Sequence, residues 1–285
     1  MMLQFARLAR GSHLILALCL QLFVLFPASA PALRADDEWP SSVRVHYAVD
    51  INGFDVGTFE YESQAEQQSY SLIGSAHLSI LLGAFTWEGQ TKSSGTIVGG
   101  VRPASFAFDF KSSLKAGSTS FAFANDTVTS ITQQPPPIVS PDAIPLREDH
   151  LKGVIDPLTA LMLVSRGSAN PCQRRLPIFD GRERFDLLFS YKGEVRVNEV
   201  MASGQPGIAM LCKVRYLPIA GHKVDADTQF MAANEGIEVA LRPIPAANLF
   251  VPYSITIPTR VGTASLQSKR VDIVTPGKPQ IALLH

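Results

Sequence analysis

Residues 43–53 read VRVHYAVDING, and this short stretch decides the fold. Apolar side chains from Val43 to Ile51 alternate with polar or small ones, which is the two-residue period of a half-buried strand. Asn52-Gly53 then supplies two residues that tolerate the positive φ angles of a tight hairpin turn. On the return strand the apolar positions change phase, and a β-bulge near Gly57 would reconcile the two phases. The stretch therefore predicts an antiparallel hairpin.

The same alternation continues along most of the chain, between further turn signals. Asp180-Gly181 marks another hairpin, and Lys192-Gly193 is interpreted as a further turn. Asp156-Pro157 begins a short helix, because Asp is a favoured N-cap and Pro is favoured at the first helical position. The pattern predicts a mainly β fold, in which a large curled antiparallel sheet (a β-spiral or half-barrel) carries one short helix packed on or into it.

The N-terminal residues predict export. Residues 14–26 are apolar except for Gln21, they follow Arg7 and Arg10, and small residues come next. This arrangement is typical of a secretory signal peptide. Thirteen residues rise only about 20 Å as a helix, which is too short for a permanent anchor.

We therefore expect residues 1–32 to be a cleaved signal peptide and residues 33–285 to form a single β-rich periplasmic domain without an integral membrane anchor. Cleavage after Ala30 would leave Pro31 first, so cleavage before Leu33 is at least as good.

Charge and cysteine content narrow the function further. The chain has 25 basic and 25 acidic residues, and losing the leader leaves a formal charge near −2. Because the Lys and Arg residues are scattered, nucleic-acid binding is excluded.

Two cysteines remain after the leader, Cys172 and Cys212, and in an oxidising compartment they predict a disulfide. It would close a loop of about 40 residues and contribute about 4 kcal/mol on the chain-entropy model. Two buried thiols or a redox pair are the alternatives, although a Cys-x-x-Cys motif is absent.

Motifs of catalysis are missing. The histidines are far apart, and there is no His-Glu-x-x-His, Gly-x-Ser-x-Gly or Walker sequence, so we predict a non-enzymatic protein without a cofactor or metal. A hydrolase acting on envelope polymers would need a carboxyl or histidine of shifted pKa in a cleft, and the sequence contains no candidate for it.

Four arginines surround the Asp180-Gly181 turn, namely Arg174, Arg175, Arg182 and Arg184. They form either a patch that binds an anionic ligand or, as we favour, a solvated hairpin edge on which the arginine charges are paired with Glu183 and Asp186.

The apolar run LSILLGAF, residues 78–85, lacks alternation and precedes Trp87. A fully buried strand explains it, and so does a segment that lines or caps an apolar cavity inside the curled sheet. The candidate cavity residues are Leu78, Ile80, Leu81, Leu82, Phe85, Trp87, Leu158, Leu161 and Met162.

Several short segments, in this order, resemble the exported bacterial family called domain of unknown function 3108. They are Tyr47-Ala-Val-Asp-Ile-Asn-Gly53 with Val56-Gly57, Trp87-Glu88-Gly89 followed by Val101-Arg102-Pro103, Asp156-Pro157-Leu158, Ile178-Phe179-Asp180-Gly181-Arg182, Cys212 leading to Pro218-Ile219-Ala220-Gly221, and Pro252-Tyr253 with Ile255. The resemblance implies a curled antiparallel sheet around a helix, similar in architecture to periplasmic lipoprotein carriers, and a role in the cell envelope without established catalytic residues.

Together these observations predict a non-enzymatic periplasmic protein that supports the envelope and binds a hydrophobic or lipid-like ligand in its curled sheet. The alternative is a structural or scaffold protein that recruits an envelope protein partner through exposed strand edges.

Overall fold

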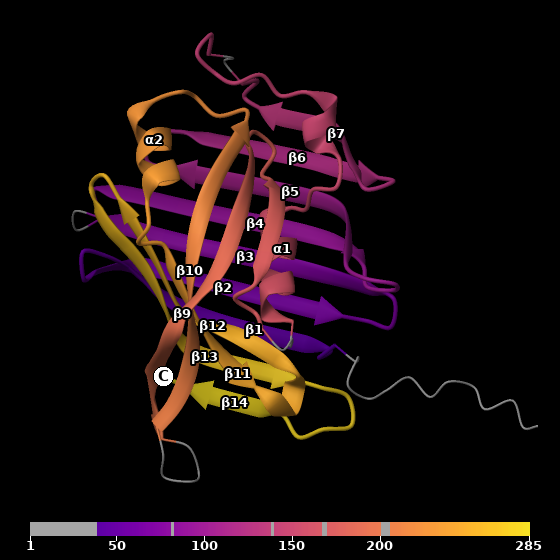
Figure 1. The fold of residues 1–285 in the computed structure, drawn as a ribbon, viewed down its shortest axis with the longest axis vertical. Coiled ribbons are helices and arrows are strands. Elements are labelled where there is room, and N and C mark those ends of the chain that lie inside the picture. The colour runs from indigo at the N-terminus through magenta and orange to yellow at the C-terminus, as the bar shows by residue number, and fades with distance from the viewer. Residues whose placement is uncertain (1–38, 81–82, 138–139, 167–169, 201–205) are drawn as a thin grey trace, which may run out of the picture. The chain divides into compact units, whose positions relative to one another are not determined.

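The computed structural model describes residues 39–80, 83–137, 140–166, 170–200 and 206–285. Within these ranges, fourteen strands form one antiparallel sheet (Figure 1) in the order β7-β6-β5-β4-β3-β2-β1-β13-β12-β11-β10-β9-β8, and β14 pairs with β13. The predicted mainly β, antiparallel architecture is confirmed. The expected leader lies outside the described residues.

The first seven strands follow one another along the chain and in the sheet. They are β1 (Ser42–Ile51), β2 (Phe54–Ala65), β3 (Ser69–Ile80), β4 (Phe85–Thr96), β5 (Arg102–Ser112), β6 (Ala116–Ala124) and β7 (Thr127–Gln134). Helices and the remaining strands follow: η2 (Glu148–Leu151), α1 (Pro157–Ser165), β8 (Arg174–Phe179), β9 (Arg184–Val200), β10 (Pro206–Ala220), α2 (Ala226–Ala233), β11 (Glu238–Ile244), η3 (Pro245–Ala247), β12 (Leu249–Thr259), β13 (Gly262–Val274) and β14 (Ile281–Leu284).

The first hairpin forms as its sequence predicts. Asn52 and Gly53 have φ angles of 54° and 81°, the positive values of a tight turn between β1 and β2. The pairing of β1 with β2 shifts between Val49 and Asp50, opposite Gly57, so the predicted bulge is confirmed. A Cβ at Gly57 would lie 1.9 Å from the His77 carbonyl oxygen, so the close approach of β3 requires glycine here.

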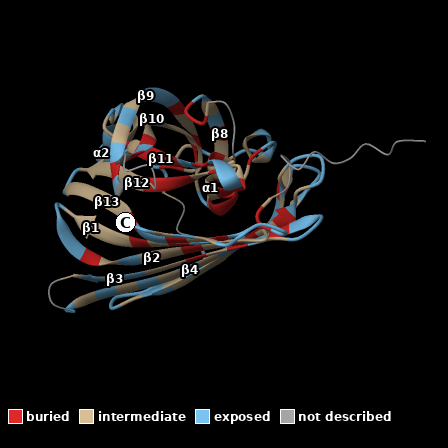
Figure 2. Cartoon of the chain, turned by 90° about the horizontal axis from the view of Figure 1, so that it is seen from below, coloured by how far each residue is buried: buried red, intermediate tan, exposed pale blue. Residues whose placement is uncertain are grey.

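Helix α1 is inserted into the curl of the sheet. It contacts β3 and β4 on one side and β8 and β12 on the other, and Figure 2 shows it between these two parts of the sheet. Leu158, Ala160, Met162 and Val164 are all buried, although they do not share one helix face. The helix is therefore packed into the sheet, and strands cover it from more than one direction.

The two ends of the sheet approach each other without pairing. The short segment before α1 joins them, because Lys152 bridges Thr127 at the start of β7 and Ile155 bridges Ile178 of β8. The Gln133 side chain of β7 also donates a hydrogen bond of 2.9 Å to the Gly181 carbonyl. The sheet is barrel-like, yet β7 and β8 remain its two ends.

The disulfide predicted from cysteine count is present. Cys172 and Cys212 are bonded, with their Cα atoms 5.2 Å apart and a sequence separation of 40 residues. Both residues are completely buried in a cluster that includes Ala160 and Val164 of α1. The bond joins the segment that follows α1 to the middle of β10.

Two local features differ from the sequence interpretation. The turn expected at Lys192-Gly193 was wrong, because β9 continues to Val200 and the register with β10 shifts there instead. Helix α2 was not anticipated, and none of its residues is buried. It contacts β10, and an ion pair of 2.9 Å joins its Asp227 to Arg260. Its 8 residues make little more than two turns, which is shorter than the window in which a helical period shows in a sequence.

Candidate functional site

The candidate cavity residues divide into two groups that the structure keeps apart. Leu158 and Met162 of α1 are buried in a core cluster, and Leu161 packs against the same cluster. Leu78, Ile80, Phe85 and Trp87 lie at the far ends of β3 and β4, and each is half-buried. Leu81 and Leu82 lie outside the described residues.

The space around α1 is filled by the protein itself. A cavity lined by Leu161, Met162, Tyr47 and Leu249 has a free volume of about 20 Å³, which is enough for roughly one water molecule. An acyl chain does not fit there. The α1 residues therefore form core, and the apolar ligand expected from the sequence needs another place.

The second group lies on the inner face of the sheet, which we define as the face toward α1. Strand β3 pairs with both neighbours without a register shift, so Leu78 and Ile80 share a face with the buried Leu72. Leu78 is paired with Trp87, and Ile80 with Phe85. These side chains extend the core face beyond the part that the helix covers, so the run is not a fully buried strand.

Two further aromatic side chains complete this surface from β5. The ring of Trp87 lies 6.3 Å from Phe108 and 6.5 Å from Phe110, centre to centre. Phe108 and Phe110 are themselves stacked at 5.7 Å. We name this group the inner aromatic surface: Leu78, Ile80, Phe85, Trp87, Phe108 and Phe110. The sequence showed the alternation of the phenylalanines, but only the register of β4 with β5 brings them beside Trp87.

Glycine makes room for these rings. A Cβ at Gly89 would lie 2.3 Å from the Trp87 indole, and one at Gly117 would lie 2.8 Å from the Phe110 ring. Both rings therefore lie directly over glycine backbone, and any larger residue would displace them. The ammonium group of Lys115 lies 5.8 Å from the centre of the Phe110 ring, which places one cation at the border of the apolar surface.

A buried polar cluster fixes α1 to the sheet. Asp156, at the N-cap, accepts hydrogen bonds from the Thr159 amide (2.9 Å), the Thr159 hydroxyl (2.6 Å) and the Ser93 hydroxyl (2.9 Å). The Tyr70 hydroxyl lies 2.8 Å from the Thr159 hydroxyl. Burial raises the pKa of Asp156, and these hydrogen bonds oppose the rise. Because Asp156 and Thr159 are completely inaccessible, we interpret the cluster as structural.

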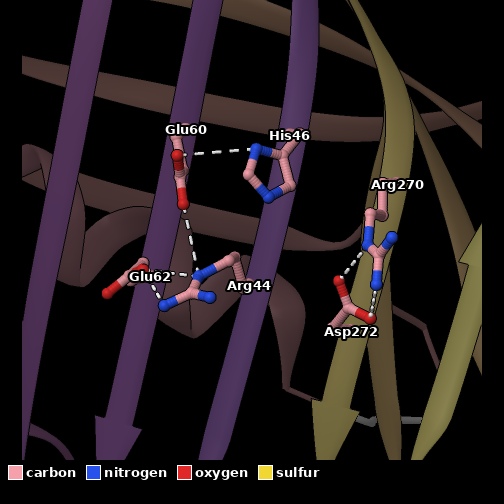
Figure 3. Close-up of polar contacts among 6 residues, drawn as sticks. All are labelled: Arg44, His46, Glu60, Glu62, Arg270 and Asp272. Atoms are coloured by element: carbon pink, nitrogen blue, oxygen red, sulfur yellow. Dashed lines mark hydrogen bonds and ion pairs between the residues drawn. The ribbon is translucent and has the colours of Figure 1, made fainter.

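The outer face of β1, β2 and β13 carries charged side chains in cross-strand pairs (Figure 3). Arg44 contacts both Glu62 and Glu60, and His46 lies 3.5 Å from Glu60. Arg270 pairs with Asp272 at 2.6 Å and holds the pKa of that carboxyl below its ordinary value. These charges alternate in sign and satisfy one another. The surface is therefore a solvated sheet face.

Three of the four arginines near the Asp180-Gly181 turn are engaged within the protein, and Arg182 is exposed. Arg175 and Arg184 both pair with the completely buried Asp186, Arg184 at 2.5 Å. Arg174 donates to the carbonyls of Leu163 and Arg166 at the end of α1. The predicted pairing with Asp186 is confirmed. Glu183 instead accepts a hydrogen bond of 3.2 Å from Tyr216.

Comparison with known proteins places this architecture in a family. The family model "Protein of unknown function (DUF3108)" matches residues 43–267. The chain belongs to the DUF3108 family. One solved structure, a "beta-barrel-like protein of domain of unknown function DUF1849 from Brucella abortus", is similar with a TM-score of 0.53 at 13% identity, covering 82% of this chain and 98% of that one. At this identity the likeness concerns the fold alone. No curated protein matches.

In this DUF3108 chain, the segments that carry the resemblance have identifiable structural tasks. Asp156-Pro157 begins the enclosed helix, and Trp87-Glu88-Gly89 places the indole over a glycine. Among the described residues, no group of three His, Cys, Asp or Glu side chains is arranged to hold a metal. Neither α-helix in these ranges has the length and apolar character that crossing a bilayer requires.

Proposed function

We propose that this DUF3108 protein is a non-enzymatic periplasmic protein of the cell envelope that holds the acyl chain of a lipid-like ligand against its inner aromatic surface. One observation carries the proposal. A continuous row of aliphatic and aromatic side chains lies on the inner face yet remains half-exposed, although the adjoining core around α1 is filled. Apolar surface left open beside a complete core is typical of a ligand-binding surface.

The chemistry of the surface favours a chain with an anionic head. The six side chains of the inner aromatic surface offer dispersion contacts and aromatic faces, and Trp87 has the only polar atom of their side chains. Lys115, at the border beside Phe110, supplies a cation for a carboxylate or phosphate. A chain lying along β3 to β5 would thus bury its methylene groups and present its head to Lys115.

The two tryptophans of the chain allow a direct test. Trp87 belongs to the inner aromatic surface, whereas Trp39 lies beside Arg166, whose guanidinium is 4.5 Å from the indole centre. In the Trp39→Phe variant, a brominated fatty acid should quench the fluorescence of Trp87. In the matched Trp87→Phe variant, the remaining emission of Trp39 should be unchanged. Absence of quenching at Trp87, or equal quenching at Trp39, would refute the proposal.

We infer a scaffold role as the second candidate, because one strand edge favours it. Strand β7, residues Thr127–Gln134, contains no charged residue and is an end of the sheet. Its Ile131 side chain is 39% exposed. However, Ser130 has a φ of 53° where the pairing with β6 shifts, and bulges of this kind protect edges from pairing. A Thr132→Lys substitution that abolishes stoichiometric recovery of one envelope protein would favour this role.

A further inference from the structure

Exposed apolar side chains occupy three strand turns at one end of the sheet. Phe54 begins β2 after the first hairpin turn and is 75% exposed, Leu114 in the β5–β6 turn is 84% exposed, and Val261 in the β12–β13 turn is 86% exposed. Single exposed apolar residues are common on protein surfaces, and what distinguishes these three is their shared place at one end of the sheet.

The pairing of the strands shows that these turns lie at the same end. Ile51, beside the first turn, is paired with Phe54 on one side and with Ala264 of β13 on the other. Strands β12 and β13 close their hairpin at Thr259 and Gly262. The Asn52 amide also donates a hydrogen bond of 2.8 Å to the Thr263 carbonyl, so the first and last of these hairpins are adjacent.

The β5–β6 turn belongs to the same row. Trp87, near the start of β4, is paired with Ser112 at the end of β5, and the Ser113 amide donates a hydrogen bond of 3.0 Å to the Thr86 carbonyl. Neighbouring hairpins in a sheet are about 10 Å apart. The three turns that carry these side chains therefore lie at one end of the sheet, next to the end of β3 and β4 that carries the inner aromatic surface.

The charges beside the tips favour an anionic surface as the partner. Lys111 and Lys115 flank Leu114, and Arg260 precedes Val261. All three cations are exposed, and Arg260 shares its charge with Asp227 through the ion pair of 2.9 Å described above. The carboxylates near Phe54 accept hydrogen bonds from neighbouring residues: Asp50 accepts from the Ser265 hydroxyl at 2.6 Å, and the exposed Asp55 accepts from the Gly57 amide at 3.0 Å. The tips thus present apolar groups with cations beside them.

We propose that this row of tips, Phe54, Leu114 and Val261, docks the protein on the surface of a bilayer that contains anionic lipid. A protein partner would bury a contiguous apolar centre, which these tips do not offer: the Val261 tip is about 10 Å from the Phe54 tip, and the Leu114 tip is about 20 Å from it, because the β3–β4 hairpin lies between. Separate side chains can each enter the fluid boundary between head groups and acyl chains, while adjacent cations contact the head groups. The docked orientation brings the inner aromatic surface to the membrane, where acyl chains are available.

Flotation with vesicles of phosphatidylethanolamine and phosphatidylglycerol tests the docking surface. The variant Phe54→Ser/Leu114→Ser/Val261→Ser should bind about a hundredfold more weakly than the unchanged protein, and each single variant about fivefold more weakly. The matched control is Val98→Ser, because Val98 is 60% exposed in the turn at the opposite ends of β4 and β5. It should bind like the unchanged protein.

Three outcomes would contradict the docking proposal. If the unchanged protein fails to float with the vesicles, if the triple variant floats equally well, or if Val98→Ser weakens binding as much as the triple variant, the docking proposal is overturned. The urea midpoint of each variant confirms that it is folded. Quenching of Trp87 by brominated fatty acid is measured without vesicles, so docking and ligand binding can fail independently of each other.

Discussion

Replacing Asp156 by Ala should destabilise the protein by about 4 kcal/mol. The substitution removes an N-cap hydrogen bond, worth about 1 kcal/mol, and two hydrogen bonds from the hydroxyls of Thr159 and Ser93 to a charged acceptor, each worth roughly 1.5 kcal/mol. All of these groups are inaccessible or nearly so, so water cannot replace the lost acceptor. Urea denaturation followed by circular dichroism measures the loss as a lower midpoint.

The matched control is Asp225→Ala in α2. Asp225 is also an N-cap and accepts a hydrogen bond of 2.9 Å from the Thr228 amide, but its helix has no buried residue. Water can replace that hydrogen bond, so the loss should be much smaller. Equal losses in the two variants, or a loss below about 1 kcal/mol for Asp156→Ala, would refute the idea that burial gives the Asp156 cluster its importance.

The same residue gives a pH dependence of defined sign. Burial raises the folded-state pKa of Asp156 above its ordinary value of 3.8, so the folded protein holds this proton more tightly than the unfolded chain does. The stabilisation that comes from this tighter proton binding is therefore complete below pH 3.8 and is lost as the pH rises through the folded-state pKa. Asp156→Asn cannot titrate, so its free energy of unfolding should lack this decline. A decline identical to that of the unchanged protein would contradict the assignment.

Three further substitutions test other parts of the structure. Replacing Cys172 and Cys212 together by Ala should cost about 4 kcal/mol on the chain-entropy model, and the urea midpoint should then no longer respond to reductant. Gly89→Ala should displace the Trp87 ring and shift its fluorescence, whereas the distant Gly53→Ala should leave that emission unchanged. Asp186→Ala should cost about 3 kcal/mol, because it leaves the two arginines without their carboxylate, and a urea midpoint within error of the unchanged protein would contradict this.

The features that the sequence predicted correctly depend on neighbours along the chain. The Asn52-Gly53 turn and the bulge at Gly57 follow from backbone preferences within a few residues. The start of α1 follows from Asp156-Pro157 in the same way. The disulfide was predictable for a different reason, because the expected loss of the leader leaves only one pair of cysteines.

The features that the sequence missed depend on strands that meet only after the sheet curls. Asp156 was recognised as an N-cap, but its bond to Ser93 spans 63 positions. Phe108 and Phe110 were recognised as strand residues, while their place beside Trp87 depends on the register of β4 with β5. At Lys192-Gly193, the local turn signal was overridden because β10 offers pairing partners on both sides of the irregularity.

Under the proposed function, stability and ligand binding depend on different parts of one sheet. The part around α1 is filled, cross-linked by Cys172–Cys212 and anchored by Asp156, so substitutions there leave cavities or unpaired polar groups. Side chains of the inner aromatic surface are only half-buried, so truncating Phe110 removes less buried area and costs less stability. A sheet divided in this way can expose apolar contacts for a ligand at one end because the other end supplies the free energy of folding. This separation explains how an apolar surface can stay open beside a complete core.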